Sequence, residues 1–553
     1  MMGALRFLVK PTILFLVVYP LLDLIVRRYP FLAPIGYGWI LVVFIMVFGV
    51  AAISFRDLVS QAGQERQWWT VTAVVVWLLF IVGAAVPERL MSDENIFEFG
   101  CPQRMFRESP DLGFLQQCFI GYPTRSFLLQ VLPVQLFGFS PFVANLGASL
   151  LLLPGIVLLA RAIRIATARA RAGDFITGLL LLFLFQCTVF IRVIYYHDQT
   201  THPVALTMIF IGLIALWLER SDRLAFFSLL ALSLVSTAMY PPFFAVLCLL
   251  IFSLGWALLR KRLPKGSAAP LLLTVALAAV SLVQTMSYRL DLRFGVDQAH
   301  IQHLPERLQQ LGLYLVTQGN GFPYGTLMFR GIFLGFLVFG LLGRFGRLIF
   351  IFCCWSTGVI VMSFFVGGMS PELAWWNMTG MHRALPVFPF FIVILAIALS
   401  KRIEPYRLSN RAISFLLFVV IAPAVWSIYN LFVPLLPPLS FRVWQVAQKL
   451  TPPGVEPKLT LMTRLDIAPL GELPKHYLYL DPKRTFEYFA GSCLPTSPVP
   501  PYTLVVTADD PICKQDTRRD GFQEVAAWGM VINGEGKLSP NMVRVYRSTA
   551  SPN

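Results

Sequence analysis

The sequence predicts a polytopic α-helical membrane protein with a small soluble α/β domain at its C-terminal end. Of the 553 residues, 57% are hydrophobic and only 13% are charged, which is too apolar for a water-exposed globular surface. Apolar runs long enough to cross a hydrocarbon core of about 30 Å recur up to residue 431. Residues 432–553 are richer in proline and in charge, as expected of a separate soluble unit.

The distribution of charge argues against a nucleic-acid-binding protein, although the net charge is +16. From residue 440 onward there are 13 Lys+Arg and 11 Asp+Glu, so 32 of the 45 basic and 18 of the 29 acidic residues precede that point. The basic excess lies in short segments between apolar runs, which is typical of cytoplasmic loops. The clearest markers are Arg161, Arg164, Arg169, Arg171, Arg260, Lys261, Arg262, Lys265, Arg344, Arg347, Lys401 and Arg402.

These markers and the apolar runs predict about 13 spanning helices, beginning from a cytoplasmic N-terminus. No small-residue cleavage site follows the first run, which therefore reads as an uncleaved helix. The predicted spans lie near residues 12–26, 37–54, 69–86, 142–163, 175–193, 203–219, 224–239, 242–259, 270–287, 330–343, 348–366, 384–400 and 411–431.

An odd number of spans places three segments outside the cytoplasm: 87–125, 288–329 and 432–553. Residues 126–136 are apolar but only about half as long as a span, and they predict a helix lying in the membrane interface. In the last segment, runs rich in β-branched and aromatic residues predict strands at 502–506 and 542–546.

Cysteine positions are compatible with this sidedness. Cys101 and Cys118 share the first outer loop, and Cys493 and Cys513 share the C-terminal segment, so each pair is a candidate disulfide, although spacing alone leaves the pairing open. The other four cysteines lie in apolar runs and are predicted to be packing residues: Cys187, Cys248, Cys353 and Cys354.

The first outer loop carries the strongest candidate for chemistry. Asp93, Glu94 and Glu98 follow directly after a predicted span, at the membrane surface. A carboxylate there could deprotonate an acceptor hydroxyl or amine, or hold a divalent metal that neutralises a phosphate. A solvated acidic loop without catalytic function is the alternative.

The order of motifs resembles the GT-C glycosyltransferases. Asp93-Glu94 is followed by Pro123–Leu129 and by Leu136-Phe137-Gly138-Phe139-Ser140, as an acidic pair is followed in that superfamily by an interfacial helix and a Leu-Phe-Gly-x-Ser turn. Ala238–Pro242 is similar to the family's Lys-Tyr-Pro turn around Tyr240, with methionine in place of lysine. His382–Pro389 is similar to its Arg-Tyr-Leu-Leu-Pro segment, with alanine in place of tyrosine.

The resemblance covers residues 69–431 and implies a polyprenyl-phosphate-linked sugar donor, with Asp93 as base and Glu94 as its neighbour or as a metal or acceptor contact. An outer α/β domain after the last span also occurs in members such as the aminoarabinose transferases of lipid A. Arg383, preceded by His382, matches the family's arginine and predicts a phosphate contact, with snorkelling to the interface as the alternative.

A second polar turn, Tyr195–Gln199, joins two predicted spans. His197 and Asp198 lie in it and Arg192 precedes it by about one helical turn, so a site for a lipid phosphate and an aromatic interface belt are equally compatible readings. In the segment that contains Asp297, His300 and His303, the two imidazoles could share one helix face and bind a metal, but no clear third ligand accompanies them. A divalent metal therefore stays open, and no other cofactor is predicted. No Gly-rich nucleotide-phosphate motif occurs.

The sequence therefore predicts a transmembrane GT-C-like domain at 1–431 and a soluble periplasmic α/β domain at 432–553. The expected activity is sugar transfer from a polyprenyl-phosphate carrier to a glycolipid, polysaccharide or protein acceptor on the periplasmic face. The expected location is a bacterial inner membrane, with membrane lipid and no nucleic acid as partner. A transporter or flippase of a lipid-linked saccharide is the main alternative, and a non-catalytic membrane scaffold is a third.

Overall fold

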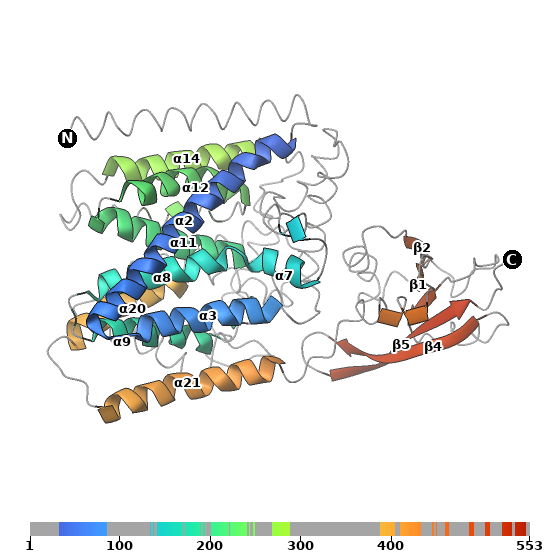
Figure 1. Cartoon of the computed structure of the whole chain (residues 1–553). Helices are drawn as coiled ribbons and strands as arrows, with labels where there is room; N and C mark the ends of the chain where they lie inside the picture. The colour runs from blue at the N-terminus through green and yellow to red at the C-terminus, as the bar shows by residue number, and fades with distance from the viewer. Residues whose placement is uncertain are drawn as a thin grey trace, which may run out of the picture.

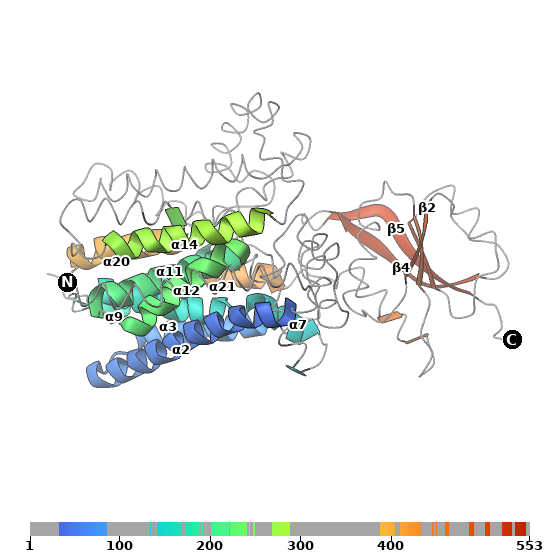
Figure 2. The ribbon, with the colours of Figure 1, turned by 90° about the horizontal axis from the view of Figure 1, so that it is seen from above.

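The structure is a computed structural model, and it describes residues 33–85, 141–168, 172–187, 201–220, 222–239, 268–287, 388–403 and 410–432, five strands between 459 and 548, and a few isolated residues between these stretches. The described part forms a helical bundle and a β-sheet that lies beyond one end of the bundle (Figures 1 and 2). The predicted spans at 12–26, 330–343 and 348–366, most of 242–259 and most of the interfacial helix 126–136 fall outside the described residues.

The described helices follow the predicted spans closely. The bundle contains α2 (Ala33–Glu65), α3 (Trp69–Ala85), α7 (Pro141–Ser149), α8 (Leu152–Ala166), α9 (Gly173–Phe183), α11 (Thr201–Arg220), α12 (Arg223–Met239), α14 (Ala268–Ser287), α20 (Phe388–Ile403) and α21 (Asn410–Phe432). Within the described residues, three helical stretches are long and apolar enough to cross a membrane: Val42–Glu65, Asn145–Ala166 and Thr201–Glu219. Shorter apolar helices accompany them.

Helix α2 extends well beyond the predicted span 37–54, ending only at Glu65. The extension carries polar residues that face another helix, as described below, so hydropathy alone ends the helix too early. Arg66 adopts a left-handed backbone with φ 55°, and the Gln67 amide donates to the Ala62 carbonyl over 3.1 Å. This is the Schellman arrangement that ends a helix, here with arginine where glycine is usual, and it reverses the chain into α3.

Two predicted spans are interrupted rather than continuous. The predicted span 142–163 is divided into α7 and α8 at residues 150–151. The predicted span 175–193 begins as α9 but passes into a 3₁₀ turn, η3 (Leu184–Gln186), which ends at Cys187 with ψ 87°. Hydropathy does not report such breaks, because the residues on both sides are equally apolar.

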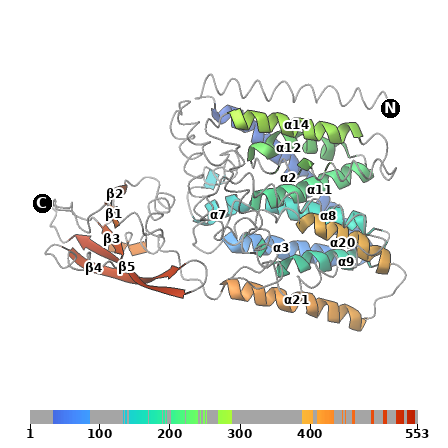
Figure 3. The same ribbon diagram turned by 180° about the vertical axis from the view of Figure 1, so that it is seen from behind.

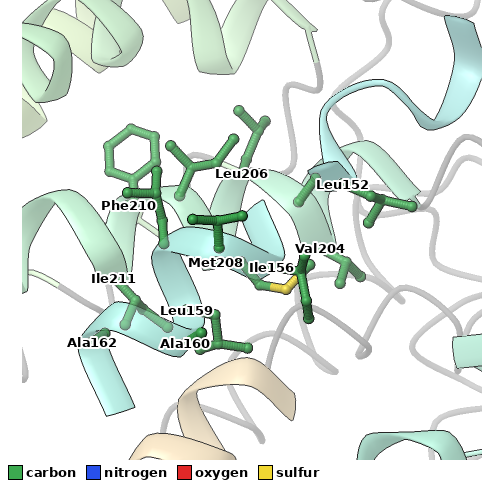
Figure 4. Packing of buried hydrophobic residues seen from close by; sticks show 14 of the residues in the cluster. Leu152, Ile156, Leu159, Ala160, Ala162, Val204, Leu206, Met208, Phe210 and Ile211 are labelled. Carbon is green, nitrogen blue, oxygen red and sulfur yellow. The ribbon is translucent and has the colours of Figure 1, made fainter. Parts of the chain in front are cut away.

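The core of the bundle lies between α8 and α11, which run parallel. A Cβ atom placed on Gly155 would lie 3.3 Å from the Ala205 carbonyl oxygen, and one on Gly212 would lie 2.7 Å from the Leu158 carbonyl oxygen. Small residues at these positions let the two backbones approach closely, as is common between membrane helices. Around the contact, the buried apolar side chains of α8 and α11 interdigitate (Figure 4).

Helices α3 and α9 are also parallel neighbours. The indole nitrogen of Trp77 donates to the Leu181 carbonyl over 2.8 Å, and its ring stacks on Phe185 at 3.8 Å between centroids. Trp77 is fully buried, so this bond satisfies a polar group that would otherwise be costly in the apolar interior.

The C-terminal sheet is mixed and has the strand order β2-β1-β3-β5-β4. The strands are β1 (Leu459–Thr463), β2 (Phe486–Ala490), β3 (Leu504–Ala508), β4 (Phe522–Ile532) and β5 (Lys537–Ser548). β1 pairs in parallel with β2 and β3, while β5 pairs antiparallel with β3 and β4. Strands β3 and β5 overlap the two predicted strand segments, and the parallel pairs of β1 with β2 and β3 cannot be joined by tight hairpins.

Candidate functional site

All of the residues predicted to act on the substrate lie outside the described residues. These are Asp93, Glu94, Arg192, His197, Asp198, Tyr240, His382 and Arg383. The cysteines of the two candidate disulfides, Cys101, Cys118, Cys493 and Cys513, lie outside them too. Of the cysteines predicted to pack, Cys187 is fully buried and Cys248 is half-buried.

The described helices nevertheless define where the first outer loop begins. Helix α2 ends and α3 starts at one end of the bundle, where α8 also ends and α9 starts; we call this the arginine end, after Arg161 and Arg164. Helix α3 runs from there to the opposite end, beyond which the β-sheet lies (Figure 1). Asp93 and Glu94 follow Ala85 within a few residues of chain, so their loop starts at the opposite end.

The arginine end is held by charged and polar side chains that sequence analysis assigned to a loop. Arg161 and Arg164 lie in the last turns of α8 and are only 2% and 6% exposed. Arg164 forms an ion pair with Glu65 of α2 at 2.5 Å, and Arg161 donates to the Gln61 side-chain oxygen over 3.3 Å. Both arginines were predicted to mark the cytoplasmic side, and the structure places them within α8, where the polar extension of α2 contacts them.

A second interaction at the arginine end joins α9 to α3. The carboxylate of Asp174, in the first turn of α9, accepts hydrogen bonds from the backbone amides of Trp69 at 2.8 Å and Thr70 at 3.3 Å. The Thr70 hydroxyl donates in return to the Asp174 carbonyl oxygen over 3.1 Å. The first amides of a helix have no partner within it, and a carboxylate at that place also matches the helix dipole.

The turn between α8 and α9 is closed by hydroxyl groups. Thr167 and Thr177 lie 3.1 Å apart between their hydroxyl oxygens, and the Thr177 hydroxyl donates to the Gly173 carbonyl over 2.7 Å. A Cβ atom on Gly173 would clash with the Thr167 carbonyl oxygen, a backbone atom that cannot easily move away. Glycine is therefore needed where the turn passes this carbonyl.

The opposite end holds buried polar residues that sequence analysis did not single out. Asn145 and Ser149 on α7 are fully buried, and Thr201 and His202 at the start of α11 are 1% and 2% exposed. Helix α7 contacts α11, so these residues belong to one region of the bundle. The signal was available, because the polar turn at 195–199 continues directly into Thr201 and His202.

Polar groups buried at this depth in a membrane protein are costly and often mark a site. Among the described residues, no group of three or more His, Cys, Asp and Glu lies close enough together to hold a metal ion. The predicted Asp297, His300 and His303 lie outside the part of the chain that the structure describes.

Comparisons with known proteins give similarity at the level of structure only. No protein-family model matches the sequence, and no curated protein matches it. The crystal structure of ArnT from Cupriavidus metallidurans bound to undecaprenyl phosphate is similar over 88% of this chain and 99% of that chain, with 13% identity and a TM-score of 0.46. The same protein in the apo state is similar over 86% and 97%, with 13% identity and a TM-score of 0.45. Values this low carry no conclusion about activity, which has to come from residues of this chain.

Proposed function

We propose that this protein is an integral-membrane glycosyltransferase that moves a sugar from a polyprenyl-phosphate carrier to an acceptor at the periplasmic face of a bacterial inner membrane. The observation that supports it most is the course of α3, which ends at Ala85, opposite the arginines and a short stretch of chain before Asp93 and Glu94. Basic residues mark the cytoplasmic side of membrane proteins. The loop that carries the acidic pair therefore starts on the non-cytoplasmic side, where the proposed reaction takes place.

The chemistry follows from the residue types. Asp93 accepts the proton of the acceptor hydroxyl or amine while the oxygen or nitrogen of that group bonds to the anomeric carbon of the sugar. The bond between the anomeric carbon and the oxygen of the carrier phosphate breaks in the same step. Arg383 contacts the leaving phosphate, whose charge a guanidinium can match with two hydrogen bonds. Glu94 contacts the acceptor or a divalent metal, and the energy for transfer comes from the phosphate-linked donor.

The buried polar residues of α7 and α11 also favour this end of the bundle as the place of the reaction. Asn145 and His202 are removed from solvent there, and they adjoin in sequence the motifs at 136–140 and 195–199. Polar side chains at that end can line a binding site for a sugar or a phosphate, and their burial keeps these side chains out of contact with lipid.

The test is product formation by purified protein in detergent or nanodiscs, supplied with a lipid-linked sugar and an acceptor extract. Asp93→Asn keeps the shape of the side chain but removes proton acceptance, so turnover should fall about 10²-fold or more while donor binding persists. The matched control is Glu98→Gln in the same loop, which should retain activity. Arg383→Ala should raise the donor concentration required, because the phosphate contact acts in ground and transition states alike.

Full turnover by Asp93→Asn would contradict the catalytic assignment and redirect attention to Glu94 and Asp198. Movement of the lipid-linked sugar across the membrane without a new glycosidic product would show a flippase instead. Sidedness is tested separately by reporters placed after Arg171 and after Ser548, which should lie on opposite sides of the membrane.

A further inference from the structure

The described helices contain a contact between two irregular points, one in α9 and one in α21. Helix α9 changes into the 3₁₀ turn η3 at Leu184–Gln186, and α21 contains Pro423 in its interior. The two helices are neighbours in the bundle, and α21 leads toward the C-terminal sheet (Figure 3). Gln186 at the end of the 3₁₀ turn is fully buried.

Pro423 leaves a backbone carbonyl of α21 without its helical donor. Proline has no N–H, so the carbonyl four residues earlier, that of Val419, receives no bond along the helix. The ring also crowds that carbonyl, and helices kink at such places. Within a bilayer no water is present to satisfy the freed oxygen, and neighbouring helices have to supply a donor.

Gln186 supplies that donor. Its side-chain nitrogen donates to the Val419 carbonyl over 3.0 Å and to the adjacent Val420 carbonyl over 3.1 Å. An amide NH₂ group has two hydrogens, so one side chain serves both oxygens, and two acceptor partners fix which atom of the amide is nitrogen. A leucine at position 186 would have a similar volume and no donor.

The position of this contact gives it a consequence beyond local stability. Pro423 divides α21 into an inner part, from Asn410, and a shorter outer part that ends at Phe432. A helix that lacks one internal bond bends more easily about that point than an uninterrupted helix does. The two hydrogen bonds from Gln186 of η3 reach α21 within one turn of Pro423, at the place where the helix lacks its internal bond.

We propose that Gln186 and Pro423 form a latched joint, in which the proline makes α21 bendable and the glutamine fixes the direction of its outer part. Release of the latch would let the outer part turn while the inner part stays packed against α9.

The first test is a double-mutant cycle on apparent melting temperature in detergent. Gln186→Leu should lower the melting temperature by about 1–3 °C, the effect expected for one interhelical hydrogen bond in a protein of this size. In a Pro423→Ala background the loss should be less than half as large, because alanine restores the helical donor to Val419. An equal loss in both backgrounds would show that Gln186 does not serve the proline-freed carbonyl, and would overturn the proposal.

The second test separates a joint from a purely stabilising bond. Spin labels introduced as noncanonical amino acids at Val425 on α21 and Leu79 on α3, which are 58% and 67% exposed, report the outer part of α21 against a fixed helix. Labels at Phe415 and Val75 report the inner part in the same way. Gln186→Leu should broaden or shift the distance distribution of the outer pair at least twice as much as that of the inner pair.

Ser233→Ala is the control, because that hydroxyl donates to the Leu229 carbonyl of its own helix over 2.6 Å and is not bonded to α21. It should leave both distance distributions unchanged. Identical outer-pair distributions in native and Gln186→Leu protein, or an equal change in both pairs, would show that no joint exists at Pro423.

Discussion

Asp174 offers the sharpest test of how the bundle fixes the start of α3. Its carboxylate is 4% exposed and accepts the backbone amides of Trp69 and Thr70 from a different helix, more than 100 residues away in sequence. Asp174→Ala would leave both amides without an acceptor where water has little access. We therefore expect α3 to open locally at its first turn, while the rest of the helix stays packed against α9.

The expected cost follows from the two lost bonds. A helix cap contributes about 0.5–2 kcal/mol, and hydrogen bonds to a charged group contribute about 1.5–3 kcal/mol each. Because the two distances differ, 2.8 Å against 3.3 Å, we expect a total of about 2–4 kcal/mol rather than the full sum. At about 1.4 kcal/mol for each factor of ten, this corresponds to about 30- to 700-fold faster exchange of the two amides.

Hydrogen–deuterium exchange on peptides that cover residues 66–72 measures this directly. Asp174→Asn should give an intermediate acceleration, because one oxygen acceptor remains. Asp222→Ala is the matched control, since Asp222 accepts the Ala225 amide of its own helix over 3.1 Å, and its loss should accelerate exchange only at the start of α12. Exchange at residues 66–72 that is unchanged in Asp174→Ala would refute the reasoning.

Three further predictions follow from the packing and from the sequence. Gly212→Ala should destabilise the protein by about 1–3 kcal/mol, because the new Cβ atom would lie 2.7 Å from the Leu158 carbonyl oxygen. Gly63→Ala should be neutral or slightly stabilising, because the space around Gly63 is open. Thermal melting in detergent compares the two variants. Glu65→Gln should lower the free energy of unfolding by about 1–3 kcal/mol, because it removes the carboxylate that pairs with the buried Arg164. The effect is limited because the Glu65 side chain is 37% exposed. Equal melting temperatures of the native and Glu65→Gln proteins would show that the ion pair does not stabilise the fold. If the predicted outer segments lie in an oxidising compartment, alkylation of the unfolded, unreduced protein should leave four cysteines unmodified. These are Cys101, Cys118, Cys493 and Cys513. Alkylation of all four would remove the support that disulfides give to the predicted outer location of these segments.

The helical part of the fold could be predicted from hydropathy because a bilayer admits few alternatives. A spanning segment has to satisfy its backbone internally, so an apolar run of sufficient length predicts a helix almost by itself. The ends of α3, α11, α12, α14, α20 and α21 accordingly lie within about four residues of the predicted spans. Strands β3 and β5 were predictable from their β-branched residues, but their neighbours in the sheet were not.

What hydropathy could not predict is the role of individual polar residues. Arg161 and Arg164 carry the charge pattern of a cytoplasmic loop, yet they are buried because α2 continues past its apolar part and supplies Gln61 and Glu65. Asp174 reads as an ordinary residue in a first helical turn, and only the neighbouring position of α3 gives its carboxylate two amides to accept.

The sequence by itself predicted an apolar helical protein suited to a membrane, and the positions of the helices that the structure describes, because transfer free energy depends on composition and length. Only the tertiary structure decided which helices are neighbours, that Gln186 meets the Val419 carbonyl freed by Pro423, and that the arginines are enclosed. These contacts join residues distant in the chain, and a local pattern contains no information about which distant backbone a side chain will reach.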